Sequence, residues 1–356
     1  MNMKNKKNIK ILLVWVLIII LASSFATGCS PEKEIDADQI MDEEPADYYL
    51  NLYITRSPYG LNWESPSTLA RSLLKNAVPS FLGTSSTMLG HTNYELKGAG
   101  EDPIYAGMSY HDQSEAIKLI FSDKTGLGLL FHNMAGRFDD FENINDARKG
   151  FLEGNTSIIT FTFDEETYRQ IKNYVEAYLD KGEHLNYGLH NNPFLSASKG
   201  ISREEIDKFP QNEDGIPLGA GCTAFAVSSL QELEIFDLEV YNQWYAEARA
   251  PEEFIGQYSD QTYSCGEELE ELHPMNNFEG KKVSIWNIIF NAHSWAEESE
   301  PGQDILYYCP DSIHEWVEKA ANKYEVGSEV MSGRLTSIEE APSPGSSYRL
   351  VIDLTK

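Results

Sequence analysis

The stretch Gly219-Ala220-Gly221-Cys222-Thr223-Ala224-Phe225-Ala226-Val227-Ser228-Ser229-Leu230 joins a small-residue turn to an apolar segment. Its apolar residues recur at the spacing of one buried helical face: Ala224, Phe225, Val227 and Leu230. The pattern therefore predicts a buried helix with Cys222 in its first turn. At that position the unpaired backbone N–H groups and the positive end of the helix dipole favour the thiolate over the thiol.

This environment suits Cys222 as a nucleophile, because the thiolate is the reactive form of cysteine. Gly219 and Gly221 lie just before it and allow other groups to approach the sulfur closely. The alternative is a small apolar cysteine packed at a helix start, since free cysteine is commonly buried. The stretch alone leaves both interpretations open.

Residues 1–29 are typical of a targeting segment rather than of a fold. Four lysines precede an apolar run at 11–22, which has the length of a signal-peptide core and is shorter than a membrane span. The following Ala26-Thr27-Gly28-Cys29 resembles the lipobox of bacterial lipoproteins. The resemblance implies that Cys29 is the lipid-modified first residue of the mature chain. An uncleaved anchor or an ordinary signal peptide is the alternative.

Residues 30–46 contain Pro31, Pro45 and a run of Asp and Glu with few apolar side chains, so they predict a disordered acidic tether. The lipoprotein resemblance implies a protein outside the cytoplasm, anchored to the bacterial cell envelope by a lipid such as palmitate. Ser30, where Asp would favour the inner membrane, implies the inner face of the outer membrane in a two-membrane bacterium.

The chain is strongly acidic, with 28 basic residues against 56 acidic ones, and four of the lysines lie in the targeting segment. We therefore expect no nucleic-acid partner, and direct docking onto anionic lipid is opposed. The remaining residues, 47–356, suffice for one elaborated domain or two small ones. We divide them into a core at 47–235 and a C-terminal elaboration at 236–356, which is either one wall of a cleft or a separate recognition module.

Three cysteines remain once Cys29 carries a lipid. Cys265 and Cys309 both lie in the C-terminal half beside Tyr and turn residues, and an exported protein meets an oxidising compartment. We expect a Cys265–Cys309 disulfide, which would leave Cys222 as the free thiol. Three reduced cysteines are the alternative.

Alternating apolar residues predict strands at 48–55, 87–96, 104–111, 126–133 and 157–163, and a closing pair at 333–339 and 348–354. Helical spacing and capping residues predict helices at 67–77, 164–181, 283–296 and 311–324. Asp164 is the expected N-cap of the second of these helices.

His91, Asn93 and Glu95 lie on one face of the predicted strand 87–96. A polar face is unusual for a core strand, and the alternative is a solvent-facing edge. If this strand pairs with 104–111 around a turn near Gly100, the residue opposite His91 is Ser109, with His111 close by.

This order of parts resembles the circularly permuted branch of the NlpC-type, papain-like thiol hydrolases, which includes the lecithin:retinol acyltransferase relatives. In that branch a strand with the catalytic His comes first, and a strand–helix unit and a Tyr-containing approach to the Cys helix follow. The resemblance covers about residues 48–235, where many relatives carry Asn or Asp in place of Gly221. The matching pieces are Gly90-His91-Thr92-Asn93-Tyr94-Glu95-Leu96, Thr160-Phe161-Thr162-Phe163 with its helix, Tyr187-Gly188, and Gly221-Cys222-Thr223-Ala224-Phe225.

The resemblance implies an α+β fold, in which a permuted papain-like antiparallel sheet packs against the Cys-bearing helix and a C-terminal α/β elaboration follows. It also implies acyl transfer, with Cys222 as nucleophile and His91 as base. Relatives draw the group that orients the imidazole from the following strand, which favours His111. Other orienting or oxyanion-binding candidates are Asn93, Glu95, Ser109, Tyr187 and the Cys222 backbone N–H.

The histidines show no metal-ligand spacing such as His-Glu-x-x-His, so we expect no metal and no cofactor. The leading hypothesis is a lipid-anchored thiol hydrolase or acyltransferase whose substrate is a peptidoglycan peptide or a lipid acyl group. The second hypothesis is a catalytically inactive envelope lipoprotein that binds a ligand or protein partner in the same cleft. A purely structural envelope protein would not explain why Gly221-Cys222 and the polar strand face coexist.

Overall fold

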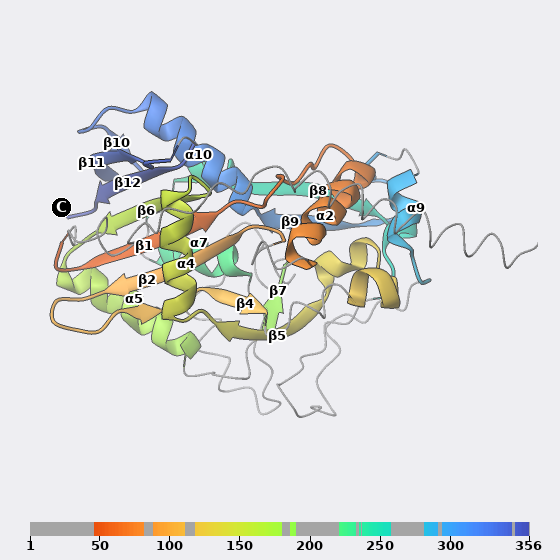
Figure 1. Cartoon of the computed structure of the whole chain (residues 1–356), viewed down its shortest axis with the longest axis horizontal. Coiled ribbons are helices and arrows are strands. Elements are labelled where there is room, and N and C mark those ends of the chain that lie inside the picture. Colours follow the sequence, from red (N-terminus) through yellow and green to blue (C-terminus); the bar gives the residue numbers. More distant parts are fainter. Residues whose placement is uncertain are drawn as a thin grey trace, which may run out of the picture.

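The computed structural model describes residues 46–81, 88–110, 118–179, 186–189, 221–232, 235, 237–257, 281–290, 294–343 and 346–355. A seven-stranded sheet lies at its centre, in the order β10-β11-β12-β6-β1-β2-β3 (Figure 1). The strands are β1 (Tyr49–Thr55), β2 (His91–Lys97), β3 (Ile104–Tyr105), β6 (Thr156–Thr162), β10 (Glu329–Val330), β11 (Gly333–Glu340) and β12 (Tyr348–Asp353).

The sheet is mixed. Strand β1 runs antiparallel to both β2 and β6, whereas β12 runs parallel to β6. Parallel neighbours need a long crossover connection, and here most of the C-terminal half of the chain separates β6 from β12. The expectation of an antiparallel sheet is therefore correct around β2 and wrong at β12, and the α+β class is confirmed.

Helices cover both faces of this sheet. On one face, α4 (Phe141–Leu152) packs on β1, β2 and β6, and Figure 1 shows it crossing in front of these strands. The other face lies against α5 (Glu165–Leu179), α7 (Cys222–Glu232) and α10 (Pro310–Lys323). The remaining helices are α2 (Pro66–Phe81), α8 (Leu238–Tyr241) and α9 (Ile285–Phe290), of which α2 and α9 pack together.

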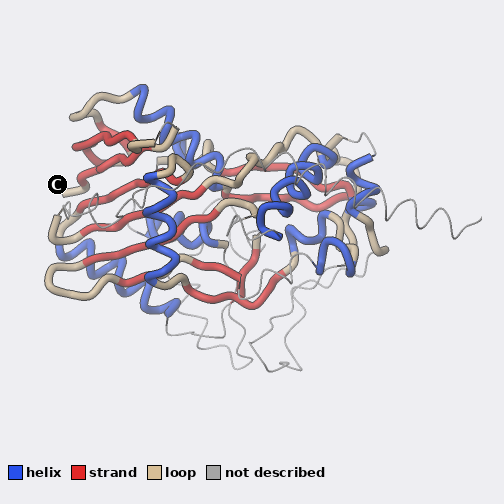
Figure 2. Tube along the Cα trace, in the orientation of Figure 1, coloured by secondary structure: helices blue, strands red, loops and turns tan. Residues whose placement is uncertain are grey.

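Two smaller sheets flank the large one, as the strand trace in Figure 2 shows. One holds β4 (Met108–Tyr110), β5 (Asn133–Phe138) and β7 (Asn186–Gly188), and the other holds β8 (Tyr245–Pro251) and β9 (Gly302–Tyr308). The predicted strand 104–111 is thus divided between two sheets. It breaks at Gly107, whose backbone lies so close to Asp139 that an added Cβ would be 2.1 Å from the carboxylate oxygen.

Most of the other predicted elements are confirmed with small shifts of their ends: β1, β2, β6, α2, α5, α10, β11 and β12. Asp164 caps α5, since its carboxylate accepts the Thr167 N–H at 2.8 Å. The strand predicted at 126–133 is wrong, because Leu127–Phe131 form a 3-10 helix. A short buried apolar run fits either structure, and its periodicity cannot distinguish them. The helix predicted at 283–296 is shorter, at Ile285–Phe290.

The C-terminal half of the described chain is part of the same fold. Strands β10, β11 and β12 extend the central sheet, and α10 packs on β1, β6 and β12. The elaboration predicted at 236–356 therefore contributes strands to the same sheet as the core predicted at 47–235. The targeting segment and tether predicted at 1–46, including Cys29, lie outside the described residues apart from Ala46. Within the described part, no helix has the length and apolar character needed to cross a membrane.

Candidate active site

Cys222 is the first residue of α7. The Phe225 N–H donates to the Gly221 carbonyl at 2.9 Å, which starts the helix at the predicted position. A Cβ on Gly221 would lie 2.9 Å from the Gly188 carbonyl oxygen, so the end of β7 leaves no room for a side chain there. This contact explains why residue 221 is a glycine.

Strand β2 brings His91 to this helix start. The hydroxyls of Thr92 and Thr223 hydrogen-bond at 2.9 Å, and the Tyr94 ring packs edge-on against Phe225 with centroids 5.3 Å apart. The His91 imidazole and the Thr92 backbone N–H both interact with the Cys222 sulfur and lower the pKa of the thiol. The structure thus brings the predicted pair, Cys222 and His91, together.

Asp139 completes the cluster, and sequence reasoning missed it. Its Oδ2 lies 2.7 Å from His91 Nε2, while Asn93 Nδ2 donates to the same oxygen at 2.9 Å. Ser109 Oγ donates to Oδ1 at 2.7 Å, and the Asp139 side chain is only 1% exposed. Asp140, the next residue, caps α4 by a capping box. The signal available in the sequence was the pair Asp139-Asp140 before a helical pattern. Only one of two such carboxylates is needed to cap the helix, so the other is available for another role.

The register predicted for the strand after His91 holds, although that strand is split. Glu95 pairs with Tyr105 and Leu96 with Ile104, the register that puts Ser109 opposite His91 if it is extended, whereas Ser109 itself lies in β4 and pairs with Arg137 of β5. Ser109 Oγ lies 3.4 Å from His91 Nε2. His111, the favoured orienting residue, lies outside the described residues, and among the described ones Asp139 holds that position beside the imidazole.

Glu95 does not belong to the site, although it shares a strand face with His91. Its carboxylate binds Arg148 at 2.8 Å and accepts hydrogen bonds from Tyr53 and Asn51. These partners lie in β1 and α4, on the face of the sheet that α4 covers. This face of β2 is buried at Asn93 and Glu95, so the alternative of a solvent-facing edge is wrong, and the alternation of polar residues did not predict how their roles divide.

Three tyrosines lie around the thiol, of which Tyr187 and Tyr307 are buried and Tyr110 is half-buried. The Tyr187 hydroxyl, one of the predicted candidates, lies 3.7 Å from Cys222 Sγ. The Tyr110 ring packs edge-on against Tyr187 at 4.8 Å, and Tyr307 interacts electrostatically with Cys222 from β9. Burial raises the pKa of Tyr110 to about 12 and holds the pKa of Tyr187 and Tyr307 well above the usual value. All three phenols are therefore neutral hydrogen-bond donors at physiological pH.

The charges of the site favour a thiolate–imidazolium pair. Burial by itself raises the pKa of the Cys222 thiol, but the His91 charge, the His91 hydrogen bond and the Thr92 N–H together lower it below the usual value. Burial lowers the pKa of His91, and the neighbouring Asp139 and Cys222 outweigh it and raise that pKa well above the usual range. Each partner thus stabilises the charged form of the other.

The disulfide predicted between Cys265 and Cys309 is not formed at Cys309, whose thiol is free. Cys309 is 1% exposed and precedes Pro310 at the start of α10, so its sulfur faces the core rather than the surface. Burial raises the pKa of the Cys309 thiol to about 12, so Cys309 is much less reactive than Cys222. Cys265 lies outside the described residues.

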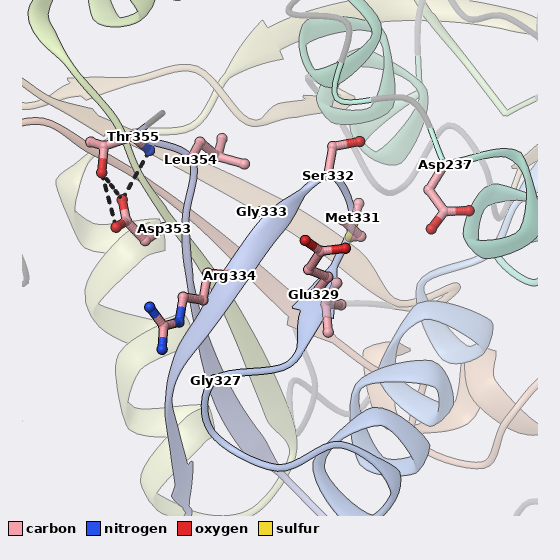
Figure 3. A pocket seen from close by; sticks show the side chains of 11 residues that line it. Asp237, Gly327, Glu329, Met331, Ser332, Gly333, Arg334, Asp353, Leu354 and Thr355 are labelled. Carbon is pink, nitrogen blue, oxygen red and sulfur yellow. Dashed lines mark hydrogen bonds between the residues drawn. The ribbon is translucent and has the colours of Figure 1, made fainter.

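No cluster of three or more His, Cys, Asp or Glu side chains in the described ranges is arranged to hold a metal ion. A pocket of about 720 Å³ lies away from Cys222, around the β10–β11 hairpin (Figure 3). Its lining includes the acidic residues Asp237, Glu329 and Asp353 and the basic residue Arg334. The Asp353 carboxylate accepts hydrogen bonds from the backbone N–H and the hydroxyl of Thr355. None of the predicted site residues lines this pocket.

We base the function proposed below on the geometry around Cys222, His91 and Asp139. Comparison of the chain with protein-family models, with curated proteins and with solved structures gave no match.

Proposed function

We propose that this protein is a thiol hydrolase or acyltransferase built on a permuted papain-like core. Cys222 is the nucleophile, His91 the general base and acid, and Asp139 the orienting group. The observation that carries the proposal is one imidazole that hydrogen-bonds to a buried carboxylate and interacts with a thiol at a helix start. That arrangement activates a nucleophile through a base, and the base is itself oriented by a third group.

The reaction begins from the thiolate and the imidazolium. The sulfur attacks the carbonyl carbon of an amide or ester, so a C–S bond forms and the carbonyl π electrons move to oxygen. The oxyanion then collapses, the bond to the leaving nitrogen or oxygen breaks, and His91 gives its proton to that leaving group. Water, or an acceptor hydroxyl or amine, next loses a proton to His91 and attacks the thioester, which releases the acyl product and the thiolate.

Asp139 decides which ring nitrogen faces the sulfur. Because His91 Nε2 lies against Asp139, a proton on Nε2 is held there and Nδ1 is left to exchange a proton with Cys222. Asn93 and Ser109 donate to the same carboxylate, so its orientation is fixed. Two of the residues predicted to orient the imidazole thus act on it through Asp139.

The developing oxyanion has two candidate donors. The Cys222 backbone N–H lies at the start of α7, where the helix leaves its first N–H groups without internal partners. The neutral Tyr187 hydroxyl lies 3.7 Å from the sulfur, on the side of β7. Donors of this kind stabilise charge in a water-excluded site much more strongly than they do in water.

The substrate and the location follow from the sequence. We propose that Cys29 carries a lipid and holds the enzyme at the bacterial cell envelope, outside the cytoplasm. The candidate substrates there are the amide bonds of peptidoglycan peptides and the esters of lipid acyl groups. The burial of Cys222, which is 4% exposed, favours a second candidate, an inactive lipoprotein that binds a ligand in the same region.

Activity-based labelling distinguishes the two candidates. The full-length protein, purified in detergent, is treated with a thiol-directed acylating probe, and the modified peptide is identified by mass spectrometry. We expect selective modification of Cys222, with loss of labelling in His91→Ala. Labelling that does not depend on His91 would favour the binding protein.

A further inference from the structure

A corner of the C-terminal half, Tyr307–Asp311, lies where β9 turns into α10 (Figure 1). Its first contact is with the chain that leads into His91. The Tyr307 hydroxyl donates to the Leu89 carbonyl at 3.2 Å, two residues before His91. The Tyr307 ring also stacks on Trp63 with centroids 5.6 Å apart, and the residue is only 6% exposed. The hydrogen bond to Leu89 and the stacking on Trp63 therefore fix the Tyr307 side chain.

The second contact explains the glycine next to His91. Gly90 has a φ of +76°, a left-handed conformation that glycine adopts without steric cost. A Cβ at this position would lie 2.9 Å from Pro310 Cβ and 2.9 Å from the Thr55 carbonyl oxygen. Pro310 thus packs directly on the backbone turn from which β2 and His91 start.

The third contact fixes the other strand at this end of the sheet. Thr55, the last residue of β1, is opposite His91 in the β1–β2 ladder. In the loop that follows, the backbone N–H and the hydroxyl of Ser57 both donate to the Asp311 carboxylate at 2.6 Å, and the Leu61 N–H donates to it at 2.9 Å. Asp311 therefore holds the chain leaving β1, as Tyr307 and Pro310 hold the chain entering β2.

We propose that the corner Tyr307–Asp311 positions His91 for its contacts with Cys222 and Asp139. This inference rests on the proposed function of the same site. It gives the C-terminal half a role in the chemistry, since the corner fixes both backbone segments at the end of the ladder that carries the imidazole. Tyr307, Pro310 and Asp311 are positioning residues that act through His91. The contacts of Tyr307 with Leu89 and of Pro310 with Gly90 lie within two residues of the catalytic base.

The experiment measures the alkylation of Cys222 by iodoacetamide against pH in the full chain. Tyr307→Phe keeps the ring on Trp63 and removes only the hydroxyl that binds Leu89. We expect its reactivity profile to shift to higher pH in the direction of His91→Ala, with labelling near pH 6 reduced about two- to fivefold, the effect of losing one ordinary hydrogen bond. Ser57→Ala removes one of the three donors to Asp311 and is expected to shift the profile in the same direction by less.

The neighbouring tyrosine supplies a matched control. Tyr308 is equally buried, and its hydroxyl has no hydrogen-bond partner in the described structure. Tyr308→Phe should therefore give the wild-type profile. A Tyr307→Phe profile that coincides with wild type, while His91→Ala shifts, overturns the positioning role and leaves the proposed function intact. If His91→Ala itself coincides with wild type, the proposed function and the positioning role both fail.

Discussion

Strand β2 carries two buried polar clusters that begin alike and differ in what lies opposite them. At its start, His91 and Asn93 meet Asp139, with the Cys222 thiol on the other side of the imidazole. Farther along the same face, Glu95 meets Arg148. Both carboxylates are 1% exposed, so burial does not distinguish the clusters.

The difference between them is the capacity to move a proton. Arg148 keeps its proton at any ordinary pH, and burial together with Glu95 raises the pKa of Tyr53, which hydrogen-bonds to that carboxylate. Arg148 and Tyr53 in the Glu95 cluster therefore keep their protons at ordinary pH. In the His91 cluster, by contrast, the imidazole lies between a carboxylate and a thiol with a lowered pKa. A buried polar strand face indicates function only where a titratable base meets a nucleophile.

Loss of the nucleophile should have the largest effect. Cys222→Ser is nearly isosteric, so we expect a folded protein with no covalent labelling and no turnover, because the hydroxyl is a far weaker nucleophile when the base is unchanged. Labelling by the acylating probe and thermal unfolding measure the two properties on one sample. Cys309→Ser is the matched control, since that buried thiol has a raised pKa, and it should label at the wild-type rate. Residual turnover in Cys222→Ser would assign the chemistry to another residue.

Loss of the orienting carboxylate should come next. Asp139→Asn keeps the size of the side chain and removes the charge that raises the pKa of His91. The pKa of the imidazole should therefore fall. Because His91 then carries less positive charge, the pKa of the Cys222 thiol should rise, and alkylation of Cys222 should move to higher pH. We expect turnover to fall roughly 10²-fold or more, in line with the loss of an orienting carboxylate in other triads. A wild-type alkylation profile in Asp139→Asn would remove Asp139 from the mechanism.

The second cluster should respond in the opposite way. Glu95→Gln leaves Arg148 without its counter-ion in a buried setting, so the free energy of unfolding should fall by about 2 to 4 kcal/mol. The alkylation profile of Cys222 should remain that of wild type, because the Glu95 carboxylate is bound by Asn51, Tyr53 and Arg148 rather than by the site residues. Denaturant unfolding and alkylation measure the two properties. Glu95→Gln combined with Arg148→Met should recover part of the lost stability, and a shifted alkylation profile would show that the two clusters are coupled.

The sequence predicted the site where local pattern and spacing were enough. Local pattern placed Cys222 at a helix start and His91 on a polar strand face, and strand register placed Ser109 near His91, whereas the catalytic roles of Cys222 and His91 depended on resemblance. The orienting role given to His111 depended on resemblance, and Asp139 was missed because it follows β5, a strand that the sequence did not predict. The turn of the chain at Gly107 and Asp139 is a tertiary contact, which periodicity does not contain.

The fold shows the same limit at a larger scale. Strands such as β1 and β6 were predictable because their apolar residues alternate or run together. That β12 would lie parallel to β6 depends on a pairing between residues such as Leu350 and Ile159, far apart in the chain. The place of β10, β11 and β12 in the same sheet as β2 depends on this kind of contact. Sequence pattern predicts the elements, and long-range packing decides their order.

The smallest expected effect comes from the hydroxyl pair that joins the Cys222 helix to β2. Thr92→Val keeps the backbone N–H that donates to the sulfur and removes the hydrogen bond to Thr223, so the free energy of unfolding should fall by about 1 kcal/mol. Thr55 and Thr156 form the same kind of pair at 2.9 Å between β1 and β6, and Thr55→Val should cost a similar amount. Only Thr92→Val loosens the link between α7 and β2, so it alone should slow the alkylation of Cys222, by less than Asp139→Asn does. Thr92→Val combined with Thr223→Val should regain stability, because no hydroxyl is then left unpaired. Equal alkylation rates in Thr92→Val and Thr55→Val would show that this hydroxyl pair stabilises the fold without holding the thiol against His91.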